Sequence, residues 1–392
     1  MHAVLPDPEK GRRVLGGVLY ALAVLVGGLL LLCLFILPAV LDRHAAQRLT
    51  AMAVGAALAF IPLVLYMSIP RIIDRFDPEP WWCLALALVW GAIAACGFAA
   101  AINTVVQWGL AQALSASTAS ALTACICAPL TEEFWKGLGV LGVFYFLRRE
   151  FDGVVDGVIY ATFVALGFAA IENVTYYATA ELARHHVLGF TFLVRGILAP
   201  WGHPLYTSMT GLGFGVSRET TRPWLRWGAP LFGYGGAVLL HSIWNTAATL
   251  SGMLWLLMLP LWLLFVAAFL GLLIWLVARK GRIIRENLKD EVLLGVLSAN
   301  ELELVASPVG RMKAGMSHGQ LGREFISAAT RLGLSKWHTA RAMKGQKRTV
   351  SADWIVPLRS EIGVLRSRLI QARGRPLVAG PPPQMWAPPR RY

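Results

Sequence analysis

Residues 118–147 read TASALTACICAPLTEEFWKGLGVLGVFYFL, an apolar stretch with two carboxylates and an ammonium group near its middle. Its length exceeds the roughly 20 residues that an α-helix needs to cross about 30 Å of hydrocarbon. A charged side chain at the centre of a bilayer costs about 3 kcal/mol on insertion scales, so Glu132, Glu133 and Lys136 are candidates for a functional site. Pro129 lacks an amide donor and predicts a loosened or kinked helix just before the acids.

Hydrophobic stretches of similar length recur along the chain. With 56% hydrophobic residues, 15% charged residues and a mean hydropathy of +0.58 over 392 residues, the chain lies outside the soluble globular class. We expect an all-α polytopic membrane protein with about eight transmembrane helices. The first stretch runs past the length of a signal-peptide core without an obvious stop, so we count it as a span. The predicted spans are residues 14–36, 51–69, 82–106, 118–147, 154–178, 200–216, 227–249 and 253–278.

Lys and Arg side chains are distributed unevenly over the connections between these spans. Connections on one side hold most of them, including Arg12, Arg71, Arg148 and Arg222, whereas the other side holds few, such as Arg48. Because cytoplasmic segments near span ends carry the excess of Lys and Arg, both termini are predicted to be cytoplasmic. The predicted location is the plasma membrane.

The sequence divides into a membrane body, residues 1–278, and a basic cytoplasmic tail, residues 279–392, which carries nearly all of the net charge of +14. Within the tail, apolar residues at helical spacing predict a short helical bundle, namely Leu321, Phe325, Ala328 and Leu332. The proline-rich chain from about residue 373 is predicted to be disordered. Basic residues beside a span are attracted to anionic lipid at about 1 kcal/mol each, so we expect lipid as the partner of the tail and not nucleic acid.

Four further candidate residues lie in the spans that follow the acids. Glu172 lies near the outer end of the fifth span, His203 opens the sixth, and His241 and Asn245 lie one helical turn apart in the seventh. Neutral imidazole can hold a metal, relay a proton or orient a water molecule, and an Asn amide can donate to a developing oxyanion. The sequence therefore predicts a water-containing cavity among spans four to seven, lined by these side chains.

Taken together, these segments resemble the PrsW-type intramembrane proteases, which are distantly related to the glutamate-type CAAX-prenyl proteases and bacteriocin-processing enzymes. The resemblance covers about residues 70–250. It is carried by an ordered set of motifs: Asp74-Arg75-Phe76-Asp77-Pro78-Glu79-Pro80, Glu132-Glu133-x-x-Lys136, Asp152-Gly153-x-x-Asp156-Gly157, Phe168-x-x-x-Glu172-Asn173, His203 and His241-x-x-x-Asn245.

The resemblance implies a membrane-embedded endopeptidase that cuts membrane-anchored proteins. Some family members are associated with the release of anti-sigma factors, so regulators of that kind are candidate substrates. It implies Glu132 or Glu133 as the base that activates water, Glu172 and His203 as completion of the polar centre, His241 and Asn245 as groups that polarise the scissile carbonyl, and Lys136 and Asn173 in support.

Zinc is the cofactor to weigh against this glutamate mechanism. A zinc ion would use His203, His241, Glu133 and Glu172, but their spacing matches no recognised zinc motif, such as His-Glu-x-x-His. We therefore favour glutamate catalysis without a cofactor. Two rival hypotheses remain: a proton- or ion-coupled transporter, because intramembrane Glu, His and Lys also build proton relays, and a catalytically silent membrane scaffold. Helix orientation decides between Glu132 and Glu133 as the base.

Overall fold

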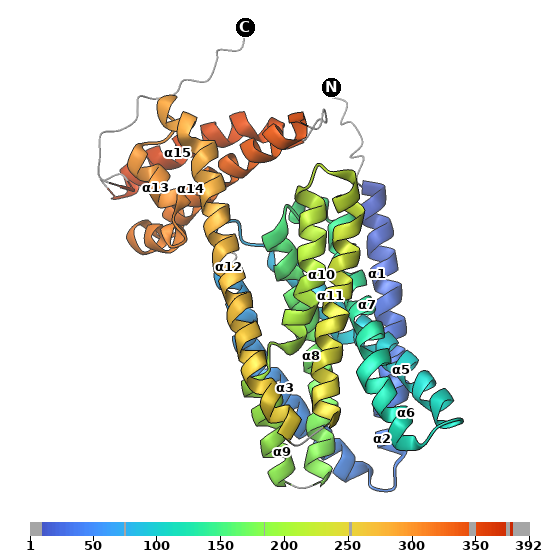
Figure 1. Cartoon of the computed structure of the whole chain (residues 1–392). Helices are drawn as coiled ribbons and strands as arrows, with labels where there is room; N and C mark the ends of the chain where they lie inside the picture. Colours follow the sequence, from blue (N-terminus) through green and yellow to red (C-terminus); the bar gives the residue numbers. More distant parts are fainter. Residues whose placement is uncertain are drawn as a thin grey trace. The chain divides into compact units, whose positions relative to one another are not determined.

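Every regular element is a helix within the residues that this computed structural model describes, which are 10–73, 76–183, 185–250, 253–344, 350–373 and 377–378 (Figure 1). The all-α prediction is confirmed. The predicted disorder beyond residue 373 concerns positions 374–376 and 379–392, which lie outside the described residues. The α-helices are α1 (Lys10–Leu31), α2 (Leu37–Leu41), α3 (Ala45–Ile73), α4 (Trp81–Val89), α5 (Cys96–Ala111), α6 (Ala116–Leu122), α7 (Ala128–Phe146), α8 (Val154–Ala183), α9 (His185–Phe192), α10 (Gly202–Glu219), α11 (Pro223–Leu250), α12 (Met253–Leu293), α13 (Ala299–Ala306), α14 (Gly310–Lys344) and α15 (Ile355–Arg373).

Wide π-helical turns interrupt several of these helices. One of them, Thr123–Cys127, joins α6 to α7 directly before Ala128 and Pro129. Because proline has no amide hydrogen and crowds the preceding turn, a local change of helix type relieves the conflict. The irregularity predicted at Pro129 is therefore confirmed. The other π-helical turns are Leu32–Ile36, Trp90–Ala95 and Leu193–Leu198, and short 3₁₀ turns occupy Arg148–Glu150 and Val350–Trp354.

Among the described residues, five helical stretches are long and apolar enough to cross a membrane: Lys10–Leu41, Ala45–Arg71, Trp81–Ala111, Val154–Ala183 and Pro260–Leu293. The remaining three predicted spans also fold as helices, in α7, α10 and α11, but they are more polar. In α7 the cause is the Glu132, Glu133 and Lys136 group. The protein is thus a multi-pass membrane protein, and the count of eight spans stays a prediction.

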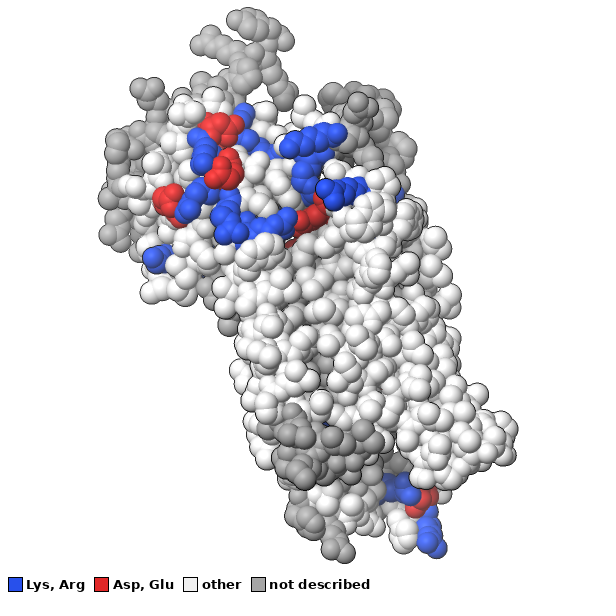
Figure 2. Space-filling model, in the orientation of Figure 1, with Lys and Arg blue, Asp and Glu red and all other residues white. Residues whose placement is uncertain are grey.

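The chain forms two compact units: Met1–Ile72 with Glu79–Phe269, and Ile73–Pro78 with Leu270–Tyr392. In the first unit α8 is the central helix, since 94% of its apolar window is buried, and it contacts α4, α7 and α10. By contrast, α1 and α3 bury little of their apolar windows. Figure 2 shows that the flank of this unit is almost free of charged side chains, as a lipid-facing surface requires.

Two glycines allow α8 and α10 to approach closely. A Cβ atom added to Gly157 would lie 2.2 Å from the carbonyl oxygen of Gly211, and one added to Gly211 would lie 2.2 Å from that of Gly157. Such distances exclude any side chain at either position. These glycines permit close packing of the two helices and fix how far α10 stands from α8.

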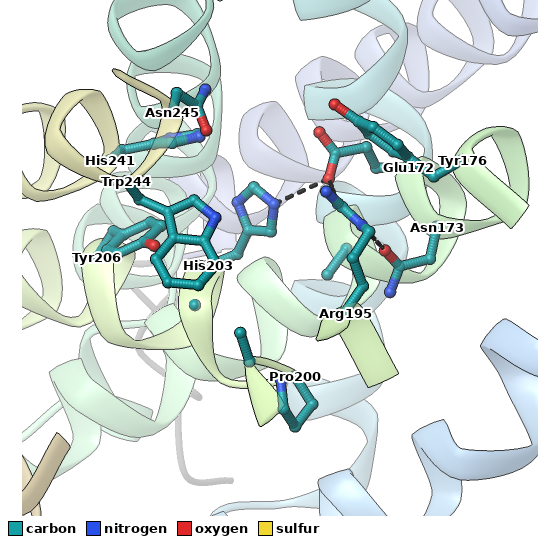
Figure 3. A pocket seen from close by; sticks show the side chains of 13 residues that line it. Glu172, Asn173, Tyr176, Arg195, Pro200, His203, Tyr206, His241, Trp244 and Asn245 are labelled. Atoms are coloured by element: carbon teal, nitrogen blue, oxygen red, sulfur yellow. Dashed lines mark hydrogen bonds and ion pairs between the residues drawn. The ribbon is translucent and has the colours of Figure 1, made fainter. Parts of the chain in front are cut away.

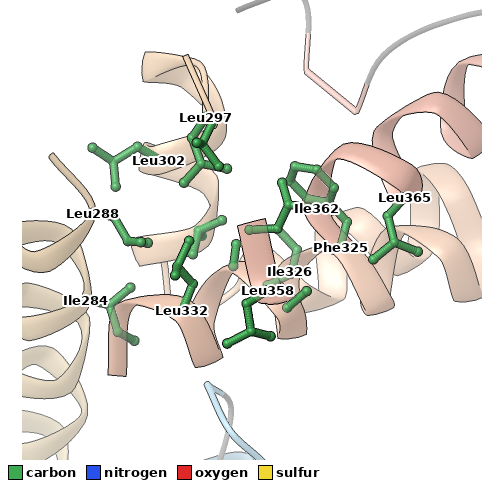
Figure 4. Close-up of a cluster of buried hydrophobic side chains, with 14 of the residues drawn as sticks. Ile284, Leu288, Leu297, Leu302, Phe325, Ile326, Leu332, Leu358, Ile362 and Leu365 are labelled. Atoms are coloured by element: carbon green, nitrogen blue, oxygen red, sulfur yellow. The ribbon is translucent and has the colours of Figure 1, made fainter. Parts of the chain in front are cut away.

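The second unit is a helical bundle with a core of its own (Figure 4). Phe325, Ala328 and Leu332 are buried in this core and Leu321 packs against it, so the predicted helical face in the tail is confirmed. Helix α13 begins with a capping box between Ser298 and Glu301. Other core residues come from the end of α12 and from α15, including Leu288, Ile362 and Leu365.

Two buried carboxylates tie the helices of this bundle together. Glu291 is fully buried and accepts hydrogen bonds from Lys336 at 2.6 Å and from Arg359 at 2.7 Å. Glu301 accepts from Arg366 at 2.7 Å. The hydrogen bonds to Glu291 raise the pKa of Arg359 above its usual range. Since each carboxylate is paired and hydrogen-bonded, its burial is compensated.

Candidate active site

The centre of the site is one turn of α7 that carries three ionisable side chains. Glu133 and Lys136 are fully buried, and Glu132 is 7% exposed. The ammonium nitrogen of Lys136 lies 2.8 Å from Oε1 of Glu133 and 3.6 Å from Oε2 of Glu132. These are the i,i+3 and i,i+4 pairings that the sequence predicts.

The two adjacent glutamates have different surroundings. The carboxylate of Glu133 accepts hydrogen bonds from Lys136, from the hydroxyl of Thr207 at 2.8 Å and from Nδ1 of His241 at 3.1 Å. Within the described residues, Oε2 of Glu132 is buried and has no hydrogen-bond partner. It lies 3.9 Å from Nε2 of His241. Glu133 therefore orients its neighbours, and Glu132 has a free acceptor beside an imidazole.

His203 is held between two charged groups. Its Nε2 lies 2.9 Å from Oε2 of Glu172, and its Nδ1 lies 2.9 Å from the ammonium nitrogen of Lys136. An ammonium group can only donate, so Nδ1 accepts and Nε2 carries the proton that Glu172 accepts. His203 is thereby fixed in one tautomer by its neighbours.

Arg195, in the π-helical turn Leu193–Leu198, completes the arrangement from the other side (Figure 3). Its guanidinium pairs with Glu172, donates from Nε to Oδ1 of Asn173 at 2.6 Å, and stacks over the ring of Tyr176 at 3.8 Å. Arg195 thus holds the carboxylate that orients His203. A continuous polar chain runs from Arg195 through Glu172, His203 and Lys136 to Glu133.

A small cavity of about 40 Å³ opens beside these groups, with room for a few water molecules. Figure 3 shows His203 between the Glu172–Arg195 pair and the group of Tyr206, Trp244 and His241. The ring of Tyr206 stacks on that of His241 with centroids 5.1 Å apart. The lining residues are Ala169, Glu172, Asn173, Tyr176, Arg195, Ala199, Pro200, Gly202, His203, Tyr206, His241, Trp244 and Asn245.

The structure brings the predicted residues into one connected region, with two differences of detail. Asn245 lines the cavity, but its amide donates to the carbonyl oxygen of Ala124 at 2.9 Å. Asn173 acts indirectly, because its Oδ1 accepts from Arg195, which pairs with Glu172. Sequence reasoning missed Arg195 and Thr207. A lone arginine in the apolar stretch VLGFTFLVRGILAP, residues 187–200, was the available signal for the first.

A motif typical of serine hydrolases also occurs in the tail, far along the chain from the active-site residues. Residues 315–319 read Gly-Met-Ser-His-Gly, the spacing of a serine nucleophile elbow. Here Ser317 lies inside α14 and its hydroxyl donates to the helix carbonyl of Lys313 at 3.0 Å. A nucleophile elbow needs a sharp strand-to-helix turn that exposes the hydroxyl, so this segment does not build one.

A metal ion would require donors that converge on one point. Donor atoms of Glu132, His203 and His241 lie within 4.8 Å of one another and could hold a metal ion. Three ligands with an open position are typical of catalytic zinc. The group differs from the set expected from sequence, because Glu132 takes the place of Glu133 and Glu172. The ammonium of Lys136, however, already uses the accepting nitrogen of His203, so a metal ion bound there would compete with Lys136.

The fold and the site define a class of protein, a multi-pass membrane protein with a buried centre of carboxylates and imidazoles beside a small cavity. A family model described as PrsW family intramembrane metalloprotease matches residues 79–282, just over half of the chain. The chain belongs to the PrsW family and is an intramembrane protease. The resemblance seen in the sequence is thereby confirmed.

Three curated relatives are similar to parts of the chain, each named Protease PrsW. The protein of Geobacillus kaustophilus (strain HTA426) is 27% identical over 180 residues, which are 44% of this chain and 73% of the relative. That of Oceanobacillus iheyensis is 34% identical over 24% of this chain and 39% of the relative. That of Clostridioides difficile (strain 630) is 31% identical over 30% of this chain and 48% of the relative. No solved structure matches the chain.

Proposed function

We propose that this protein hydrolyses a peptide bond of membrane-anchored protein substrates with a water molecule that Glu132 activates. The observation that carries the proposal is the buried oxygen Oε2 of Glu132, which has no hydrogen-bond partner among the described residues and lies 3.9 Å from Nε2 of His241. This separation is too long for a direct hydrogen bond, and the proposal places a water molecule between the two atoms, bonded to both.

The proposed reaction uses the side chains as they lie. His241 donates from Nδ1 to Glu133, so its Nε2 accepts and helps to orient the water. Glu132 takes one proton from that water while the oxygen attacks the carbonyl carbon. The carbon–nitrogen bond then breaks, and the proton passes from Glu132 to the leaving amine. Asn245 uses one amide hydrogen on Ala124 and has a second to donate to the oxyanion.

The choice of Glu132 as the base follows from the contacts of its neighbour. Glu133 accepts from three donors and would have to release one before it could take a proton from water. Glu132 needs no such exchange. General bases contribute about 10²–10⁴-fold to rate, which is the effect that this proposal assigns to Glu132.

The proposed substrates are membrane-anchored regulators of the anti-sigma-factor kind, cut within or next to their membrane segment. A base buried in a membrane helix reaches substrates that enter from the bilayer. We propose further that both termini face the cytoplasm and that the basic tail lies near anionic lipid, through residues such as Arg279, Lys280 and Arg282 directly after the last predicted span.

The test is cleavage of a library of single-span substrates by purified protein in liposomes. Wild type is compared with Glu132→Gln and with the matched control Glu219→Gln, whose carboxylate accepts from the amide of Val154 away from the cavity. We expect cleavage by wild type and by the control, with and without chelator, and cleavage about 10²–10⁴-fold slower by Glu132→Gln. Equal cleavage by all three proteins refutes the role of Glu132. Ion uptake that depends on Glu132, without cleavage, would favour a transporter.

A further inference from the structure

The ammonium of Lys136 has the surroundings that a metal ion has in a protein. Its nitrogen lies 2.8 Å from Oε1 of Glu133, 2.9 Å from Nδ1 of His203, 3.6 Å from Oε2 of Glu132 and 4.0 Å from the ring centre of Phe168. The side chain is fully buried. An ammonium with carboxylate, imidazole and aromatic neighbours on several sides is held as a cation in a closed site.

This ammonium competes with a metal ion for one lone pair. His203 donates from Nε2 to Glu172, so Nδ1 offers the ring's one accepting lone pair, and Lys136 uses it. A zinc ion bonded to Nδ1 would lie about 2.0–2.1 Å away along the same direction. It would therefore overlap with the ammonium nitrogen. Binding through Nε2 instead would break the bond to Glu172 and turn an N–H towards Lys136.

The balance of charges at the centre also indicates that Lys136 takes the place of a metal ion. Glu132, Glu133 and Glu172 face two cations, Lys136 and Arg195. With neutral imidazoles, the loss of the ammonium would leave two uncompensated negative charges in a buried region, which is costly. A divalent cation bound by Glu132, His203 and His241 would neutralise them.

We propose that Lys136 is the built-in cation of this centre, that it excludes a divalent metal ion from the wild-type protein, and that its removal turns Glu132, His203 and His241 into a zinc site. The inference rests on the proposed function, because it explains how hydrolysis proceeds there without a metal ion. Its test measures the zinc content of the protein and not cleavage. A failure of this inference can therefore be told apart from a failure of the proposed hydrolysis.

The experiment compares purified wild type, Lys136→Met, Lys136→Arg and the double variant Lys136→Met/His203→Ala. Each protein is equilibrated with zinc, dialysed and analysed for zinc per chain by mass spectrometry, with a chromophoric chelator as competitor. Methionine keeps the length of the side chain without its charge, and arginine keeps the charge. We expect about one zinc per chain in Lys136→Met and essentially none in the other three.

A wild-type protein that retains one zinc per chain through dialysis would overturn the inference whatever the variants do. So would a folded Lys136→Met protein that binds no zinc. If Lys136→Met is unstable when prepared without metal, its unfolding temperature is followed during zinc titration. A zinc-dependent rise in Lys136→Met that is absent in wild type and in the double variant supports the inference, and the absence of any rise contradicts it.

Discussion

Replacing each of the two adjacent glutamates by glutamine separates a reacting group from a positioning group. Glu132→Gln removes a carboxylate with no hydrogen bond to Oε2 and leaves the three bonds of Glu133 in place. We expect a folded protein whose cleavage rate falls about 10²–10⁴-fold, the usual contribution of a general base. Its stability should change less than that of Glu133→Gln, because Glu132 lies farther from Lys136, at 3.6 Å against 2.8 Å, and its Oε2 has no hydrogen bond to lose.

Glu133→Gln should act mainly on stability. All three partners of this carboxylate, Lys136, Thr207 and His241, donate to it. Glutamine is neutral, so the ammonium of Lys136 would lose its closest negative charge. Removing one partner of a buried ion pair costs about 3–5 kcal/mol. We therefore expect a clearly lower unfolding temperature together with lost cleavage.

The assay measures thermal unfolding in detergent and cleavage in liposomes on the same preparations. The ratio of the two effects is decisive, because Glu132→Gln should lose activity with the smaller change in stability and Glu133→Gln should lose both. Activity of Glu132→Gln within a few-fold of wild type would refute the assignment of the base. A Glu133→Gln protein as stable as wild type would refute the positioning role.

Three further predictions test the surroundings. Arg195→Ala should lower the cleavage rate about 10–100-fold, as the loss of an outer orienting group does. Added guanidinium should restore part of the lost rate. A rate that guanidinium leaves unchanged would contradict a positioning role. Gly157→Ala should lower the unfolding temperature through overpacking worth about 1–3 kcal/mol, and Gly142→Ala, whose added Cβ meets nothing within 4 Å, is its control. Phe325→Ala should cost about 3–5 kcal/mol in the tail bundle, detected as faster limited proteolysis of residues 270–392 in the full chain, and equal proteolysis rates would refute the core of Figure 4.

The helical fold could be predicted from the sequence because the signals are local. Apolar stretches of membrane length, the proline at position 129 and the helical spacing around Phe325 each depend on a few neighbouring residues. The number of membrane spans was harder to predict. In α7, α10 and α11, buried polar side chains such as Glu133, Thr207 and His241 lower the hydropathy, so the count of eight spans stays a prediction.

The residue types of the site were also predictable, but their pairing was not. Which oxygen meets which nitrogen depends on the rotation of α7 against α10 and α11, and no local pattern encodes that rotation. Thr207 gave no signal, because a hydroxyl in a membrane helix usually bonds its own backbone. Arg195 falls between the predicted spans 154–178 and 200–216, although its guanidinium bonds Glu172 and Asn173 inside the site.

The adjacency of Glu132 and Glu133 itself explains their division of roles. Consecutive residues of an α-helix point about 100° apart, so the two carboxylates meet different neighbours. Here the second carboxylate meets Thr207 of α10 and His241 of α11. It turns Nδ1 of His241 towards itself and leaves Nε2 directed at Glu132. In Glu133, Oε1 accepts from Lys136 and His241 and Oε2 accepts from Thr207, so both of its oxygens are engaged. The proposed hydrolysis therefore takes its acceptor for water from Glu132, whose Oε2 has no hydrogen bond among the described residues.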